Sequence, residues 1–366
     1  MSQCPCPRTC KGSNGLSSFR LCACKVRLPI TWAAFADALQ PLDKATYGAH
    51  SADLDIVTVP DPFYKDQASF VTIPRQMLSD FLRQAKLSGL RVILDIHAYP
   101  GGASHGTYNG VWPLKCAFWT EKSKIGPEKN LTEVGMWIVE KMIHWIENLD
   151  FEPQGAIAGI VLMNEPGHMN RWKQFAADKA ILAWLSEASA RYSRSELPFL
   201  GIKLYMNLVE TAFQDFEGVV VPWYHSTFSL EERKTRVVAD VHYYMAWDYH
   251  VCDGRSDPFG AYSCTQNYQG TLRGCAEGNA KNMRRRWSQH DELVAVSEFS
   301  LGTFDQIDLA CKELPVLETM LKEQLAAFAK YNFETIFWTW KMPYATDFQP
   351  GWSLKWLLSQ HQERKK

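Results

Sequence analysis

The stretch TIPRQMLSDFLRQAKLSGLRVILDIH, residues 72–97, decides the fold class because it joins a helix-like segment directly to a strand-like one. The first part predicts a helix with Thr72 as its cap, Pro74 in its first turn and Gly89 as its stop. The apolar side chains expected on one face of this helix are Met77, Leu78, Phe81, Leu82 and Ala85. The run RVILDIH is almost wholly apolar up to its polar end, which predicts a strand buried on both faces of a parallel sheet.

The same alternation of strands and helices extends along the chain. Strands are expected at CKVRLPI (24–30), RVILDIH (91–97), GIVLMNE (159–165), FLGIKLYM (199–206), VVADVHYY (237–244), ELVAVSEF (292–299) and TIFWTW (335–340). Further helices are expected over 131–148, 171–194, 279–289, 315–331 and from 353 onward. The pattern predicts an α/β fold, a (β/α)8 TIM barrel whose first βα unit is missing or irregular. We expect residues 1–23 to be an irregular cysteine-rich segment and residues 24–366 to be one catalytic domain.

Composition limits the partners of this chain. The 366 residues carry a net charge of −1, so no field exists to attract nucleic acid or an anionic membrane. No apolar run is long enough to cross a bilayer, and Met1–Leu28 lacks the uninterrupted apolar stretch that is typical of a secretory signal. We expect a monomer that is extracellular if the natural chain continues upstream. The 14 tryptophans favour sugar binding, because flat apolar rings suit the C–H faces of sugars.

The cysteines are unevenly placed. The first group, in and near CPCPRTC at residues 4–10, does not have the paired spacing of a zinc finger, so a metal site is the weaker interpretation. The second group, Cys252, Cys264 and Cys275, shares a region that reads as a loop. Its spacing leaves the pairing open, and we favour a disulfide formed in an oxidising compartment over reduced thiols.

Polar residues gather at the ends of the expected strands. They are Arg27, Asp95, His97, Asn164, Glu165, Asn207, Asp240, His242, Tyr244, Glu298, Trp338 and Trp340. In a parallel αβ barrel the reactive groups lie at the carboxyl ends of the strands. These positions are therefore the candidates for chemistry.

Two of these residues are carboxylates that can act together. Glu165 and Glu298 are 298 − 165 = 133 residues apart, which fits three βα units and places their strands on opposite sides of a barrel mouth. Retaining glycoside hydrolysis needs one carboxylic acid to protonate the leaving oxygen and one carboxylate to attack, about 5 to 5.5 Å apart. Two like charges in one pocket resist joint ionisation, so one of the pair is expected to keep its proton.

Neighbouring polar groups fit the same chemistry. Arg27 would hold the nucleophile ionised, and Asn164 would donate to a sugar 2-hydroxyl. His242 and Tyr244 lie at i and i+2 and therefore share one strand face, where Tyr244 would hydrogen-bond the nucleophile. Trp338 would form a floor under the sugar ring. A lone strand histidine or tryptophan is more often a packed core group, and the two carboxylates shift this interpretation toward function.

The ordered strand ends resemble those of glycoside hydrolase family 5, also called cellulase family A. The matching motifs are KVRLPITW with Arg27, LDIHAYPGG with His97, NEP with Asn164 and Glu165, HYY with His242 and Tyr244, VSEFSLG with Glu298, and FWTWK with Trp338. The resemblance covers about residues 24–345 and is closest to the exo-β-1,3-glucanase-like branch. It implies a cofactor-free retaining β-glycosidase acting on an oligo- or polysaccharide. Glu165 would be its acid/base, Glu298 its nucleophile, and the other matched residues would bind substrate.

Other interpretations remain open. A β-1,4-glucanase or mannanase of the same family would use the same residues. A metal-dependent barrel hydrolase is suggested by DIH and DVH, which each place an Asp and a His on one strand face. A non-catalytic sugar-binding barrel is suggested by the missing first strand.

Loops and aromatic residues after the strands are expected to shape the substrate site. Residues 46–70 and 249–278 would form walls over the mouth. The candidate sugar platforms there are Tyr99, Trp112, Trp119, Trp223 and Trp247. Asn130 fits both an N-glycosylation acceptor in NLT and a helix cap with Glu133, and we favour the cap.

Overall fold

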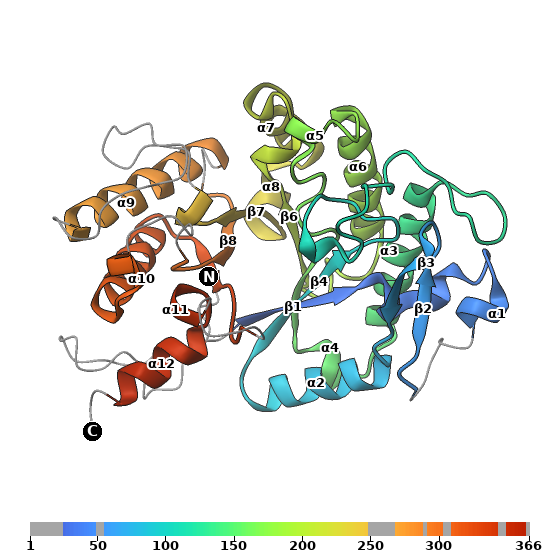
Figure 1. The fold of residues 1–366 in the computed structure, drawn as a ribbon, viewed down its shortest axis with the longest axis horizontal. Coiled ribbons are helices and arrows are strands. Elements are labelled where there is room, and N and C mark those ends of the chain that lie inside the picture. Colours follow the sequence, from blue (N-terminus) through green and yellow to red (C-terminus); the bar gives the residue numbers. More distant parts are fainter. Residues whose placement is uncertain are drawn as a thin grey trace. The chain divides into compact units, whose positions relative to one another are not determined.

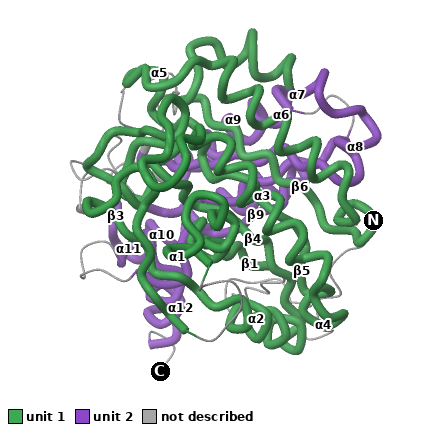
Figure 2. Tube along the Cα trace, turned by 90° about the vertical axis from the view of Figure 1, so that its right-hand side faces the viewer, with its two compact units in different colours: residues 1–223 green, residues 224–366 purple. Residues whose placement is uncertain are grey.

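A computed structural model describes residues 25–48, 55–247, 268–287, 291–302, 309–342 and 349–363. The chain divides into two compact units, residues 1–223 and residues 224–366, coloured separately in Figure 2. The predicted cysteine-rich segment 1–23, and any strand before residue 24, lie outside the described residues. The boundary between that segment and a catalytic domain stays a prediction.

Parallel strands form the sheet of the first unit, which is drawn in blue to green in Figure 1. They are β1 (Lys25–Thr31), β4 (Arg91–Ala98), β5 (Ile157–Val161) and β6 (Lys203–Asn207), which pair side by side in that order. The register places Pro29 opposite Asp95 and Asp95 opposite Val161. Val92 and Ile93 of β4, which point to opposite faces of the strand, are both fully buried, as a strand covered on both faces requires.

Helices cover these strands. The long ones are α2 (Arg75–Leu87), α3 (Leu131–Glu147) and α6 (Asp178–Arg194). The short ones are η2 (Trp32–Leu39), α1 (Lys44–Tyr47), η4 (Thr107–Asn109), α4 (Phe151–Gln154), α5 (Asn170–Lys173), η5 (Glu210–Ala212) and η6 (Phe216–Val220). Helix α7 (Val221–Thr227) includes the last residues of the first unit and the first residues of the second. Glu133 accepts a hydrogen bond from the Asn130 backbone N–H at 3.1 Å, which confirms the expected capping interaction at the start of α3.

The second unit contains three parallel strands, β7 (Val237–Tyr243), β8 (Val294–Phe299) and β9 (Glu334–Phe337), again side by side in chain order. Its helical segments are α8 (Leu230–Thr235), η7 (Met245–Trp247), α9 (Tyr268–Trp287), η8 (Leu309–Lys312), α10 (Leu314–Lys330), α11 (Gln349–Trp352) and α12 (Leu354–Glu363). Arg273 of α9 donates to Glu323 of α10 at 3.0 Å. Across the described residues, no helix combines the length and apolarity that a membrane crossing demands.

The seven expected strands are all present, and each pairing described within a unit is parallel. Several predicted boundaries are wrong. β5 ends at Val161 instead of residue 165, β9 ends at Phe337 instead of residue 340, and β6 begins only at Lys203. The helix expected over 171–194 is interrupted after α5, because Gln174 adopts a left-handed φ of 50°.

The predicted apolar face of α2 is partly wrong. Leu78 and Leu82 are buried, whereas Met77 and Phe81 are 53% and 40% exposed. Thr72 does not cap the helix, because its hydroxyl oxygen accepts from the Val57 N–H at 3.0 Å while Pro74 takes the cap position. Gly89 follows the helix with a φ of 73°, consistent with its predicted role as the stop.

The second cysteine group was also partly misread. Cys275 lies on helix α9 and not in a loop, and it is disulfide-bonded, as is Cys311. Residues 248–267, which include Cys252 and Cys264, lie outside the described residues. Cys116 carries a free thiol, and burial raises its pKa to about 12.

An antiparallel hairpin, β2 (Thr58–Asp61) and β3 (Lys65–Val71), occupies part of the expected wall segment. Its turn is organised by the fully buried Asp61 carboxylate, which accepts from the backbone N–H groups of Phe63 at 2.8 Å and Tyr64 at 2.9 Å. The same carboxylate accepts from the Gly101 N–H at 2.7 Å. Burial raises the pKa of Asp61, and the three N–H donors oppose that shift. Asp61 thus ties the hairpin to the loop that follows β4.

Replacing Asp61 with alanine should destabilise the protein. The change leaves three backbone donors without their acceptor, at a cost of about 3 kcal/mol in the free energy of unfolding. Asp66→Ala, at an exposed position of the same hairpin, should stay within about 0.5 kcal/mol. Urea unfolding of both variants measures the difference, and equal midpoints would show that Asp61 does not anchor the hairpin.

Candidate active site

A buried ion pair joins β1 to β4. Arg27 Nη2 lies 3.1 Å from Asp95 Oδ2, and the two side chains are 1% and 0% exposed. His97 Nδ1 lies 2.6 Å from the same oxygen. A neutral His97 that donates from Nδ1 keeps Nε2 as an acceptor. Asp95 therefore orients both neighbouring side chains.

The Asn164 amide joins this network from the segment after β5. Its Oδ1 accepts from Arg27 Nη2 at 2.7 Å, and its Nδ2 lies 3.4 Å from His97 Nε2. The residue is only 4% exposed. The first unit thus brings together three of the residues predicted to bind substrate. With Asp95 and Glu165 they form what we call the first cluster.

Glu165 is positioned by its backbone and not by the sheet. It lies beyond β5 with a left-handed φ of 39°, a conformation that disfavours residues with a Cβ. Its N–H donates to Asn207 Oδ1 at 2.7 Å, and its carbonyl oxygen accepts from Ser104 Oγ at 2.5 Å. Its carboxylate is 12% exposed and lies 3.8 Å from His168 Nδ1.

Hydrogen bonds join the loop after β4 to the loop after β5 around this turn. The Gly167 N–H donates to the Ala103 carbonyl, and the His105 N–H donates to the His168 carbonyl, both at 3.2 Å. With the Ser104 bond, three hydrogen bonds join the loop after β4 to the loop after β5. Sequence reasoning missed Ser104 and His168, because neither has a spacing or strand-end signal.

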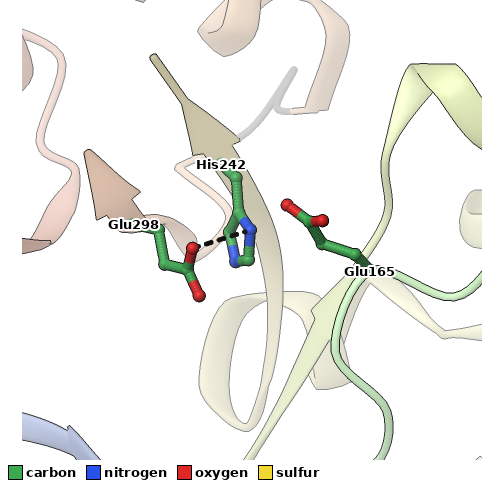
Figure 3. Close-up of side chains that lie close together, drawn as sticks. All are labelled: Glu165, His242 and Glu298. Carbon is green, nitrogen blue, oxygen red and sulfur yellow. Dashed lines mark ion pairs between the residues drawn. The ribbon is translucent and has the colours of Figure 1, made fainter. Parts of the chain in front are cut away.

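The second unit holds its own carboxylate on adjacent strands. Glu298 of β8 lies opposite His242 of β7 in the register and is 4% exposed. His242 Nδ1 lies 3.4 Å from Glu298 Oε2, the ion pair dashed in Figure 3, and the Tyr244 hydroxyl donates to the same oxygen at 2.5 Å. The hydrogen bond expected between Tyr244 and this carboxylate is present. We call these three residues the second cluster.

Further contacts brace the second cluster. Ser297 Oγ donates to Asp240 Oδ2 at 2.7 Å, which ties the residue before Glu298 to β7. The Trp352 ring lies 5.4 Å from the Tyr244 ring, centroid to centroid, at 34°. Sequence reasoning did not propose Trp352, which lies in α11 far along the chain. Trp338 is half-buried just beyond β9, and its N–H donates to the Phe299 carbonyl at 2.8 Å.

The aromatic residues expected to be sugar platforms differ in how far their side chains are exposed to solvent. Tyr99 is fully buried and Trp119 is 8% exposed, so both are packing residues. Burial raises the pKa of Tyr99, whose hydroxyl donates to the Leu162 carbonyl below the Glu165 turn. Trp223 is half-buried and donates to Ser186 Oγ at 2.9 Å. Trp112 is 51% exposed, while the Trp247 side chain lies outside the described part of the structure.

Comparison with known proteins shows the fold. No family model and no curated protein matches the sequence. Among solved structures, the chain is similar to the rutinosidase from Aspergillus niger, with a TM-score of 0.58 and 16% identity over 92% of this chain and 78% of that one. It is also similar to the glycoside hydrolase 5 lichenase from Caldicellulosiruptor sp. F32, with a TM-score of 0.51 and 10% identity over 90% of this chain and 75% of that one. The chain therefore has the (β/α)8-type fold, with seven parallel strands in the described residues.

The buried Arg27–Asp95 pair should be essential for stability. Asp95→Ala leaves a buried guanidinium without its charge partner, so the free energy of unfolding should fall by about 3 to 5 kcal/mol. The control is Asp80→Ala, which breaks an exposed pair with Arg83 and should cost less than about 1 kcal/mol. Thermal denaturation compares the two variants. Similar losses would contradict a special contribution of the buried pair.

Proposed function

We propose that this chain is a retaining β-glycoside hydrolase in which Glu298 is the nucleophile and Glu165 the general acid/base. The observation that carries the proposal is the second cluster, where Tyr244 and His242 fix one oxygen of a buried carboxylate at a strand end. Glu165 supplies a second carboxylate at the carboxyl edge of the other unit's strands. A (β/α)8 fold brings the carboxyl ends of its strands to one mouth, which supports pairing of the two.

The proposed reaction proceeds in two displacements. The Glu298 carboxylate attacks the anomeric carbon, and the glycosidic C–O bond breaks as Glu165 gives its proton to the leaving oxygen. Glu165 then takes a proton from water, the water oxygen attacks the anomeric carbon, and the bond to Glu298 breaks. Configuration is retained because each displacement inverts it. No cofactor takes part.

The first cluster supports substrate binding in this reaction. The Asn164 amide is oriented by Arg27, which contacts its oxygen and leaves the NH₂ group toward His97. That NH₂ group is our proposed donor to the sugar 2-hydroxyl, an interaction that strengthens in the transition state. Arg27 and His97 position it. His242, Tyr244 and Trp338 would bind the sugar from the second unit.

We propose β-glucan as the substrate, with β-1,3-glucan favoured by the likeness of LDIHAYPGG and FWTWK to the exo-β-1,3-glucanase-like branch. The similar solved structures carry the names rutinosidase and lichenase, which denote different substrates. A β-1,4-glucanase or mannanase is therefore the alternative of the same class. Product analysis on laminarin, cello-oligosaccharides and mannan, side by side, distinguishes them. Release of sugar from mannan alone would refute the glucan proposal.

A metal-dependent hydrolase is a weaker alternative. In DIH, Asp95 is already contacted by Arg27 and His97, and a cation beside a guanidinium would be repelled. In DVH, both Asp240 oxygens accept from Ser297, while His242 faces Glu298. The Asp of each motif is therefore already occupied by other groups of the chain, Asp95 by Arg27 and His97 and Asp240 by Ser297. Activity that disappears with a chelator and returns with a divalent cation would favour this alternative.

The two carboxylates should respond differently to mutation. Glu298→Ala should abolish turnover while sugar binding survives. Glu165→Ala should slow hydrolysis of unactivated glycosides by about 10²- to 10⁴-fold, and less for an aryl glycoside whose leaving group needs no proton. Azide should rescue Glu165→Ala and yield a β-glycosyl azide, because it attacks the α-linked enzyme intermediate with inversion.

The matched control for both is Glu187→Ala, which removes an exposed carboxylate from α6. It should keep the rate of the unaltered protein. Product configuration is read by NMR. An α-azide, or equal rates for Glu298→Ala and the control, would overturn the proposed mechanism.

A further inference from the structure

We propose that Trp112 is a sugar platform for a unit of the bound chain remote from the cleaved bond, so that the enzyme selects oligo- and polysaccharides over short glycosides. This inference rests on the proposed hydrolase function and deepens it. Four observations support it, concerning where the exposed tryptophans lie, how Trp112 is held, what else its loop contacts and what its ring can bind.

The exposed tryptophans share one topological position. Among the described residues, those that leave half or more of their surface to solvent are Trp112 at 51%, Trp172 at 50% and Trp340 at 59%. Each follows the carboxyl end of a strand, respectively β4, β5 and β9. Exposed apolar rings at that end of a (β/α)8 fold lie where substrates bind.

The buried side chain of Asn109 holds the Trp112 backbone in place. Asn109 is 2% exposed, and its Oδ1 accepts from the N–H groups of Val111 at 2.9 Å and Trp112 at 2.8 Å. Its Nδ2 donates to the Ser104 carbonyl. Gly110 lies so close to Phe70 of β3 that a Cβ there would approach the ring to 2.4 Å. The exposed indole is therefore presented by an ordered loop, which lowers the entropic cost of binding.

The same loop holds the proposed acid/base. Ser104, whose carbonyl accepts from Asn109, donates its hydroxyl to the Glu165 carbonyl. Three consecutive hydrogen bonds thus lead from the Glu165 backbone to the Trp112 backbone. A sugar ring on Trp112 would consequently lie at a fixed offset from the proton donor, as a remote subsite requires.

The chemistry of the ring defines the ligand. An indole offers a flat apolar face to the C–H groups on one side of a pyranose, together with one N–H donor. The indole carries no charge, and the net charge of the chain is only −1, so neither favours a charged ligand. The occupant we assign is therefore a neutral β-linked glucose unit of a longer chain.

The test compares substrates of different length in the full chain. Trp112→Ala should lower the ratio of kcat/KM for laminarihexaose to kcat/KM for an aryl β-glucoside about tenfold, mainly through KM for the hexasaccharide. Trp112→Phe keeps an aromatic face and should recover part of the ratio. Phe199→Ala removes an aromatic ring that is 84% exposed in the turn before β6, at the opposite strand ends, and should leave the ratio unchanged.

A binding measurement separates this inference from the proposed function. In a Glu298→Ala background, titration calorimetry with laminarihexaose and cellohexaose should show about tenfold weaker binding when Trp112→Ala is added. Unaltered affinity for both sugars, or an unaltered substrate ratio in the active chain, would overturn the platform. The two proposals can also fail separately. If the wild-type chain hydrolyses neither glycoside, but Trp112→Ala still weakens hexasaccharide binding, the platform stands and the hydrolase function is refuted.

Discussion

The buried charge of Asp95 is the constraint on which the first cluster depends. A carboxylate with no exposure to solvent requires a cation and hydrogen-bond donors. Arg27 of β1 provides the cation, and His97 of β4, the strand that also carries Asp95, contacts the same carboxylate oxygen. Their orientation then fixes the Asn164 amide, which lies directly before Glu165. One electrostatic requirement inside the strand layer is thus transmitted to the residue that we propose as proton donor.

The two clusters hold their carboxylates by different means. Glu298 lies within strand β8, and its side chain is fixed by His242 of the neighbouring strand β7 and by Tyr244 directly after that strand. Glu165 lies in a turn, and its backbone is fixed by Asn207 and Ser104. This difference fits the proposed roles. A nucleophile must approach one carbon along one line, whereas an acid/base group must serve first a leaving oxygen and then a water.

The sequence predicted the parts of the fold that follow from burial alone. Runs such as RVILDIH, apolar on both faces, identified the seven parallel strands that the described residues contain, and the polar residues at their ends named both carboxylates. It failed where tertiary contacts override local pattern. β3 is mostly exposed and polar, so its hairpin depends on Asp61 and the distant Gly101, a contact without local signal. The strand expected to reach Glu165 ends at Val161, and the Glu165 backbone bonds instead to the distant residues Ser104 and Asn207.

That left-handed turn has an evolutionary consequence. A φ of 39° at a glutamate is less favourable than at a glycine or asparagine, so the position carries a side chain that backbone energetics would not select. If stability alone were selected, Gly would be favoured at position 165, and the hydrogen bonds between the two loops would no longer be needed to hold a glutamate in this conformation. Related chains that have no use for the proposed proton donor should therefore carry Gly or Asn at this position, whereas Glu298, which lies within a strand, is under no such backbone constraint.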